Sequence, residues 1–299
     1  MVKRILLKDI VSISLPTLEI MDIGAMIEGE DRYDILVRQG LGRVTGFEPN
    51  PDNMAKLQAR PGPYRYLPYF LGNGKTAEFH YTLYPGCSSL LEPDEELINL
   101  FSTIGTEAVT GSFAVVETSE VETVRLDDID DLAFPDYVKI DVQGAELMVM
   151  ENALKAFSNV LVLQTEVEFV PLYREQPLFG DIQKFLVEQG FMLHKLIDIA
   201  GRPLRPIVMG PNPYKAMSQV LWADAIFVRD YINLSTFSDE QLLKASVILN
   251  DVYRSYDIVV RLLTEYDKRC ATDLKTKYMN VLAGHENLNL LYMNLTDHP

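Results

Sequence analysis

The sequence predicts an α/β protein with a doubly wound, mostly parallel sheet of seven strands and a helical appendage at its C-terminal end. Short apolar runs alternate with amphipathic segments, as strands and helices do in such sheets. Four of these runs lead into an acid, namely Asp22, Glu48, Asp141 and Glu166. Because open α/β sheets bind ligands beyond the carboxyl ends of their strands, we expect the four carboxylates to share one anionic crevice.

The first core strand is predicted at residues 18–23, followed by a tight turn. Gly24 and Ala25 are small residues that let the backbone approach a ligand, and Asp22 stands beside them. A helix is predicted at 28–39. This stretch is therefore interpreted as a ligand-binding turn.

The second strand leads to Glu48, which lies 24 residues after Gly24. An acid about 20 residues beyond the glycine turn of a nucleotide-binding βαβ unit reaches a ribose hydroxyl. A carboxylate can accept two hydrogen bonds from a vicinal diol, so Glu48 is a candidate ribose ligand. The alternative is that Glu48 and Pro49 only start the next helix.

A third strand is predicted at 64–71, before a turn at Gly72, Asn73 and Gly74 and a further strand at 76–83. Residues 84–135 then form an insertion before the central strand. A long excursion near the ligand edge commonly covers a site. We predict in it a helix at 94–103 and β pieces at 113–117 and 120–126.

Ser88 and Ser89 in this insertion are candidate ligand contacts, although serines are also common in turns. The fourth strand ends at Asp141. The remaining elements of this domain are predicted as a helix at 145–157, a strand at 160–166, a loop at 169–173, a helix at 181–189 and strands at 191–199 and 219–229.

Residues 235–299 are predicted to be a helical appendage to a domain formed by residues 1–234. Apolar positions keep helical spacing from 238 to about 268, and shorter helices are expected at 272–283 and 286–295. Such an apolar stripe needs a burial partner. We expect the appendage to contribute to a homodimer or to the substrate site.

Five motifs, taken in this order, resemble the FkbM family of S-adenosylmethionine-dependent methyltransferases. They are Asp22-Ile23-Gly24-Ala25, Gly46-Phe47-Glu48-Pro49-Asn50, Cys87-Ser88-Ser89-Leu90, Lys139-Ile140-Asp141-Val142-Gln143-Gly144-Ala145-Glu146 and Glu166-Val167-Glu168-Phe169-Val170-Pro171-Leu172-Tyr173. The resemblance covers roughly residues 18 to 230. It implies a Rossmann-like class I methyltransferase fold, S-adenosylmethionine as cofactor, and O-methylation, often of a sugar, glycan or secondary-metabolite hydroxyl.

The chain departs from the family's usual pattern in a few places. Met26 and Glu28 alter the glycine turn, Asn73 replaces the usual Asp near the adenine, and Gln143 replaces the common Glu. We predict cofactor contacts from Asp22, Gly24, Ala25, Glu48, Pro49, Gly72, Asn73 and Asp141.

Methyl transfer to a hydroxyl is an in-line displacement that needs alignment and is helped by a base. The candidate catalytic residues are Glu166, Asp141 and Tyr173, and the candidate substrate contacts are Ser88, Ser89 and Glu146. Glu146 is equally suited to interact with a helix dipole. No motif points to a metal.

Composition limits the possible partners. A formal net charge of −16 repels nucleic acid, no run is long enough to span a bilayer, and two cysteines are typical of a reducing cytoplasm. A nicotinamide-dinucleotide oxidoreductase is disfavoured, because Met26 takes the second glycine position and Asp22 and Glu28 would repel phosphate. A non-catalytic binding module with the same fold stays as the other alternative.

Overall fold

The computed structural model describes residues 4–27 and 29–285, which form two compact units. One unit contains residues 18–31 and 42–230. The other contains the described parts of 1–17, 32–41 and 231–299. The sequence-based boundary after residue 234 places 1–17, 32–41 and 231–234 in the first domain instead. Glu28 and the helix predicted at 286–295 lie outside the described residues.

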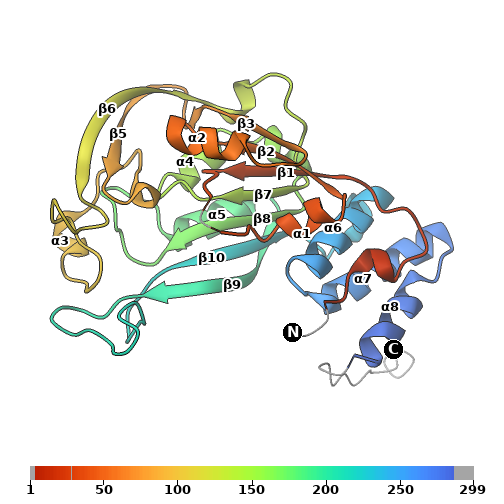
Figure 1. Ribbon diagram of the computed structural model, residues 1–299. Helices are drawn as coiled ribbons and strands as arrows, with labels where there is room; N and C mark the ends of the chain where they lie inside the picture. The colour runs from red at the N-terminus through yellow and green to blue at the C-terminus, as the bar shows by residue number, and fades with distance from the viewer. Residues whose placement is uncertain (1–3, 28, 286–299) are drawn as a thin grey trace. The chain divides into compact units, whose positions relative to one another are not determined.

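The first unit is built on a seven-stranded sheet in the order β3-β2-β1-β7-β8-β10-β9 (Figure 1). All neighbours are parallel except the last two pairs, because β10 runs antiparallel to β8 and to β9. The predicted mostly parallel, doubly wound sheet is thus confirmed. The strands are β1 (Leu18–Ile23), β2 (Gly42–Phe47), β3 (Tyr64–Leu67), β7 (Tyr137–Ile140), β8 (Val162–Glu168), β9 (Phe191–Gly201) and β10 (Val220–Arg229).

The central strands are almost fully buried, which explains their continuous apolar composition. The main core joins them to helices α4 (Glu146–Glu151) and α5 (Phe179–Glu188) through Met150 and Ile182. Helix α2 (Pro51–Gln58) packs Met54 into a smaller cluster. Helix α4 is shorter than the predicted 145–157: it ends at Glu151, and the 3-10 helix η4 (Ala156–Asn159) follows after four non-helical residues.

A three-stranded sheet, β4-β6-β5, stands beside the large one (Figure 1). The strand predicted at 64–71 is divided at Pro68, which has no N–H for a ladder: β3 joins the large sheet, and β4 (Phe70–Leu71) joins the small one. The two β pieces predicted in the insertion are one strand, β6 (Val115–Val124), paired antiparallel with β5 (Thr76–Thr82). The predicted helix at 94–103 is reduced to α3 (Glu95–Ile98).

The second unit is helical. The apolar spacing that predicted one helix from 238 to 268 is shared by two, α6 (Asp239–Asp251) and α7 (Tyr256–Cys270). Arg254 between them has φ +54°, a left-handed conformation that ends a helix and lets α7 fold back onto α6. Its other helices are α1 (Asp34–Arg38), α8 (Leu274–Ala283) and the 3-10 helices η1 (Leu7–Asp9) and η5 (Leu234–Thr236).

Two short 3-10 helices complete the first unit, η2 (Pro85–Cys87) and η3 (Leu126–Asp128).

Among the described residues, no helix has both the length and the apolar composition that crossing a bilayer requires.

Candidate functional site

A cavity of about 500 Å³ opens at the carboxyl ends of β1, β2, β7 and β8. This volume lies in the range of small-molecule pockets, roughly 300–1,000 Å³. Its walls include parts of the small sheet and of the insertion around Ser88. All of the lining residues belong to the first unit.

The floor of the cavity is the turn after β1. Gly24 has φ +81°, and a Cβ there would lie 1.8 Å from the carbonyl oxygen of Asp141, so only glycine fits. The N–H groups of Gly24 and Ala25 both donate to the carbonyl of Phe47, at 3.1 and 2.9 Å. The two amides are therefore used in holding β1 to β2.

One side of the cavity is organised by Glu48, whose side chain is buried but faces the opening. Its Oε1 accepts the backbone N–H of Asn50 at 2.6 Å. Burial raises the pKa of Glu48, while hydrogen bonds from the Asn50 backbone and the Asn53 side chain oppose that rise. The Asn50 side chain in turn caps α2 by accepting the N–H groups of Asp52 and Asn53.

Aromatic side chains cover the wall next to Glu48. The ring of Phe79 lies 4.9 Å from that of Phe70 and 4.8 Å from that of Tyr81, each pair in edge-to-face geometry. Phe79 and Tyr81 are two residues apart on β5, so they lie on the same face of the small sheet. Together with Phe70 and Tyr69 they line this part of the cavity with aromatic rings.

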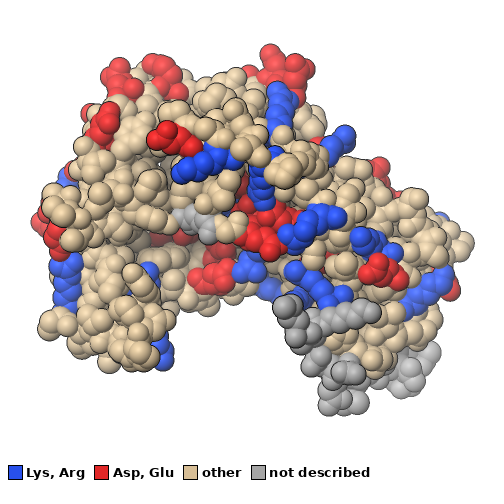
Figure 2. Space-filling model, viewed as in Figure 1, with Lys and Arg blue, Asp and Glu red and all other residues tan. Residues whose placement is uncertain are grey.

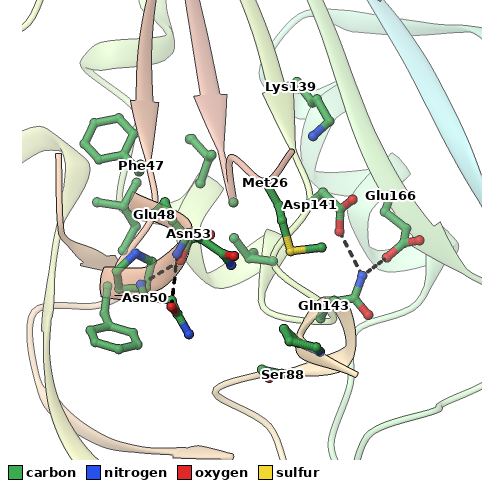
Figure 3. Close-up of a pocket in the computed structure, with 18 of the residues that line it drawn as sticks. Met26, Phe47, Glu48, Asn50, Asn53, Ser88, Lys139, Asp141, Gln143 and Glu166 are labelled. Carbon is green, nitrogen blue, oxygen red and sulfur yellow. Dashed lines mark hydrogen bonds between the residues drawn. The ribbon is translucent and has the colours of Figure 1, made fainter. Parts of the chain in front are cut away.

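On the opposite side, the amide of Gln143 joins two carboxylates (Figure 3). Its Nε2 donates to Asp141 Oδ1 at 2.8 Å and to Glu166 Oε2 at 2.7 Å. Gln143 has φ +56°, a strained conformation for a residue that is not glycine. The hydroxyl of Tyr173 lies 3.0 Å from Gln143 Oε1 and 2.9 Å from the carbonyl oxygen of Cys87. The contact with Oε1 helps to hold the Gln143 amide in this orientation.

Glu146 holds the loop that carries Gln143. Its carboxylate accepts the backbone N–H of Val142 at 2.8 Å and of Gly144 at 2.9 Å. Burial raises the pKa of Glu146 to about 7, although the backbone N–H groups oppose the rise. Glu146 therefore stabilises the loop that carries Gln143, and it does not itself line the cavity.

Glu166 lies in a crowded set of carboxyl groups. Burial, followed by the charges of Asp141, Glu168 and Glu146, raises the pKa of Glu166 well above its usual value. Oxygen atoms of Asp141, Glu146 and Glu166 lie within 4.8 Å of one another, a spacing at which a cation could be held. In this structure the Gln143 amide is placed between two of them.

The structure brings some of the predicted site residues into the cavity wall and leaves others behind it. Those in the wall are Gly24, Glu48, Pro49, Ser88, Asp141 and Glu166. Those outside the lining are Asp22, Ala25, Gly72, Asn73, Ser89, Glu146 and Tyr173.

The residues behind the wall have structural partners. Asn73 Oδ1 accepts the N–H of Lys75 within the turn between β4 and β5, and the N–H of Gly72 donates to Val124 on β6. Ser89 donates to the carbonyl of Gln143 at 2.7 Å. Ala25 is packed in the core beside α2.

Several lining residues were not predicted as site residues, namely Met26, Asn53, the aromatic wall, Lys139 and Gln143. From the sequence, Gln143 is only a departure from the family's motif, in which Glu is common. The alternation of side chains along a strand was the available signal for Lys139, since residues two apart face the same side and Asp141 was already a candidate. Nothing local in the sequence indicated that the small sheet would bring its aromatic rings to this edge.

The family model described as the methyltransferase FkbM domain matches residues 22–193. No curated protein matches the chain. Similar solved structures include a putative methyltransferase from Thermoplasma acidophilum (12% identity, 72% of this chain and 70% of that one, TM-score 0.34). Another is magnesium protoporphyrin IX methyltransferase from Synechocystis PCC 6803 with bound SAM (13%, 72% and 71%, TM-score 0.35).

A third is the Burkholderia thailandensis 1,6-didemethyltoxoflavin-N1-methyltransferase with bound 1,6-didemethyltoxoflavin and S-adenosylhomocysteine (11%, 72% and 72%, TM-score 0.35). The family assignment rests on the domain match alone. Because that match spans more than half of the chain, the protein belongs to the FkbM family of S-adenosylmethionine-dependent methyltransferases.

Proposed function

We propose that the protein is an O-methyltransferase that acts on a hydroxyl group of a sugar, a glycan or a secondary metabolite. The observation that carries the proposal is the placement of two unlike groups of side chains on opposite sides of one cavity. In Figure 3, Phe47, Glu48, Asn50 and Asn53 lie on one side and Asp141, Gln143 and Glu166 on the other.

The cavity fits S-adenosylmethionine, which supplies an electrophilic methyl group when it is bound. The aromatic wall offers a stacking surface for adenine, and the buried carboxylate of Glu48 offers acceptors for the ribose diol. The carboxylate of Asp141 suits the cationic centres of the cofactor. We assign its binding to these residues.

The acceptor hydroxyl is assigned to the side lined by Asp141, Glu166 and Ser88. There Glu166, when ionised, would take the hydroxyl proton, and the Gln143 amide would hold the two carboxylates in fixed positions. Ser88 Oγ already accepts the N–H of Thr82 at 3.0 Å, which orients its hydroxyl. These residues align and deprotonate the acceptor, which is the main task of the protein in an in-line displacement.

A dinucleotide cofactor suits this cavity poorly. The amides of Gly24 and Ala25 are bonded to Phe47, and the lining carries the carboxylates of Glu30, Asp31, Glu48, Asp141 and Glu166. A pyrophosphate would be repelled by these charges. Figure 2 shows acidic and basic side chains interspersed on the visible face, without the continuous basic surface that nucleic acid binding uses.

Isotope-labelled cofactor tests the proposal directly. The protein is incubated with S-adenosylmethionine that carries a ¹³C methyl group and with a panel of sugars, glycans and polyhydroxylated metabolites, and the products are examined by NMR. We expect the label on an oxygen of a hydroxylated acceptor. Label found only on nitrogen or carbon would contradict O-methylation.

A further inference from the structure

Lys139 is the one lining residue with a cationic side chain in the part of the cavity wall that the structure describes. It lies on β7, two residues before Asp141, so both side chains face the same side of the sheet. In Figure 3 its ammonium points toward Asp141 and Met26. Five carboxylates line the same cavity, so any ligand carboxylate that enters has this one cation to meet.

Asp22 holds Lys139 in place from behind. The Lys139 Nζ lies 3.3 Å from Asp22 Oδ1, and the Asp22 side chain is only 2% exposed whereas that of Lys139 is 18% exposed. Burial would lower the pKa of Lys139, but the charges of Asp22, Asp141 and Asp31 outweigh it and raise the pKa. Lys139 is thus charged, and it stands between a buried acid and the open cavity.

The usual alternative for binding an anion at this edge of the sheet is a set of free backbone N–H groups in the turn after the first strand. Here the N–H groups of Gly24 and Ala25 both donate to the carbonyl of Phe47. These two amides are therefore already used within the protein. An ammonium has three donors, so Lys139 can serve Asp22 and a ligand together.

We propose that Lys139 binds the α-carboxylate of the cofactor's amino-acid end and that Asp22 positions Lys139 without touching the cofactor. This assignment rests on the proposed function, because it takes S-adenosylmethionine as the ligand of the cavity. It differs from the sequence-based expectation, in which Asp22 contacts the cofactor itself.

The test compares two ligands that differ only in this carboxylate. S-adenosylmethionine and its decarboxylated form are titrated by calorimetry into the wild type and into Lys139→Met. We expect the wild type to prefer S-adenosylmethionine by about tenfold to a hundredfold, since a charge-assisted hydrogen bond is lost in the other ligand. In Lys139→Met the ratio of the two affinities should fall to about one.

Lys139→Met removes the cation beside the buried Asp22, which destabilises the protein by itself. A double variant, Asp22→Asn with Lys139→Met, removes both charges and so separates the ligand effect from this loss of stability. Lys75→Met, at an exposed position outside the cavity, is the control and should keep the wild-type ratio. A tenfold preference that survives in both Lys139 variants would overturn the assignment. So would a wild type that binds both ligands equally, whereas a wild type that binds neither would overturn the proposed function itself.

Discussion

At the scale of single residues, Gln143 decides how two carboxylates share one side of the cavity. Asp141 and Glu166 would repel each other, and the Nε2 group of Gln143 donates to both at hydrogen-bond distance. An acid at position 143 would instead add a third negative charge. The departure from the family's usual motif therefore gives both carboxylates a hydrogen-bond donor and adds no further negative charge.

Glu166 is expected to act as the base, and its raised pKa gives this role a pH signature. Since burial and neighbouring acids raise the pKa, the ionised fraction grows as the pH rises, and turnover should increase with it. Glu166→Gln should lower turnover by about 10²- to 10⁴-fold and remove this rise, with little change in cofactor affinity. Steady-state rates between pH 6 and 9 would show the effect.

The exposed Glu188 on α5 provides the control for this experiment. Glu188→Gln should keep both the turnover and the pH profile of the wild type. If Glu166→Gln retained the same profile with less than a tenfold loss, alignment without this base would be the better account.

Glu146 should make the stability of the protein depend on pH. The pKa of Glu146 is about 7 in the folded state against 4.5 for a free glutamate, so its contribution to stability is complete below pH 4.5 and is lost as the pH rises through 7. The loss corresponds to about 3 kcal/mol. Urea unfolding at pH 5 and pH 8 should show a smaller difference between the two pH values in Glu146→Gln than in the wild type, and an unchanged difference would refute this.

The positions of the strand ends could be predicted from the sequence, but the direction in which each polar side chain points could not. Glu48, Asp141 and Glu166 line the cavity because each closes an apolar run at the carboxyl edge of the sheet. Glu146 and Tyr173 lie in the same motifs, yet their polar atoms bond to the loop around Gln143. Whether a side chain lines the cavity or bonds to a neighbouring loop depends on tertiary packing, which the spacing of residues in the sequence does not reveal.

At the scale of elements, the contact between β1 and the loop after β7 fixes the floor of the cavity. Gly24→Ala would place a Cβ 1.8 Å from the carbonyl oxygen of Asp141, at a φ of +81°. We expect a loss of at least about 3 kcal/mol in the free energy of unfolding, from the clash and the strained φ together. Urea denaturation measures it.

Gly190 is the matched control because its φ is +80° and its nearest neighbour to a new Cβ is the end of Arg229 at 3.7 Å. Gly190→Ala should therefore cost only the conformational strain, about 1 kcal/mol. Equal losses in the two variants would mean that the contact with Asp141 does not constrain the turn.

Element boundaries differ from the sequence-based predictions where one residue interrupts a continuing pattern. The apolar spacing runs through Arg254, but its left-handed conformation divides the predicted helix into α6 and α7. Similarly, Pro68 separates β3 from β4 in a stretch that had the composition of one strand. The periodicity reports which side chains are buried, and it does not report where the chain turns.

At the scale of the whole molecule, the methyltransferase unit holds every residue that lines the cavity. In the other unit, α6 packs on α7, on η1 and on α1, and α7 packs on α8. The apolar stripe of the appendage thus has partners within its own unit. A homodimer through these helices stays a prediction. Sedimentation velocity would support it with a mass near twice 33.9 kDa, and a mass of one chain would contradict it.

The central claim is that this cavity binds the methyl donor with Glu48 on its ribose. Calorimetric titration of S-adenosylhomocysteine into the wild type, Glu48→Gln and the exposed control Glu78→Gln measures it most directly. We predict one site of micromolar affinity, weakened about tenfold or more in Glu48→Gln and unchanged in Glu78→Gln. Equal affinity in all three proteins, or no binding to the wild type, would contradict the claim.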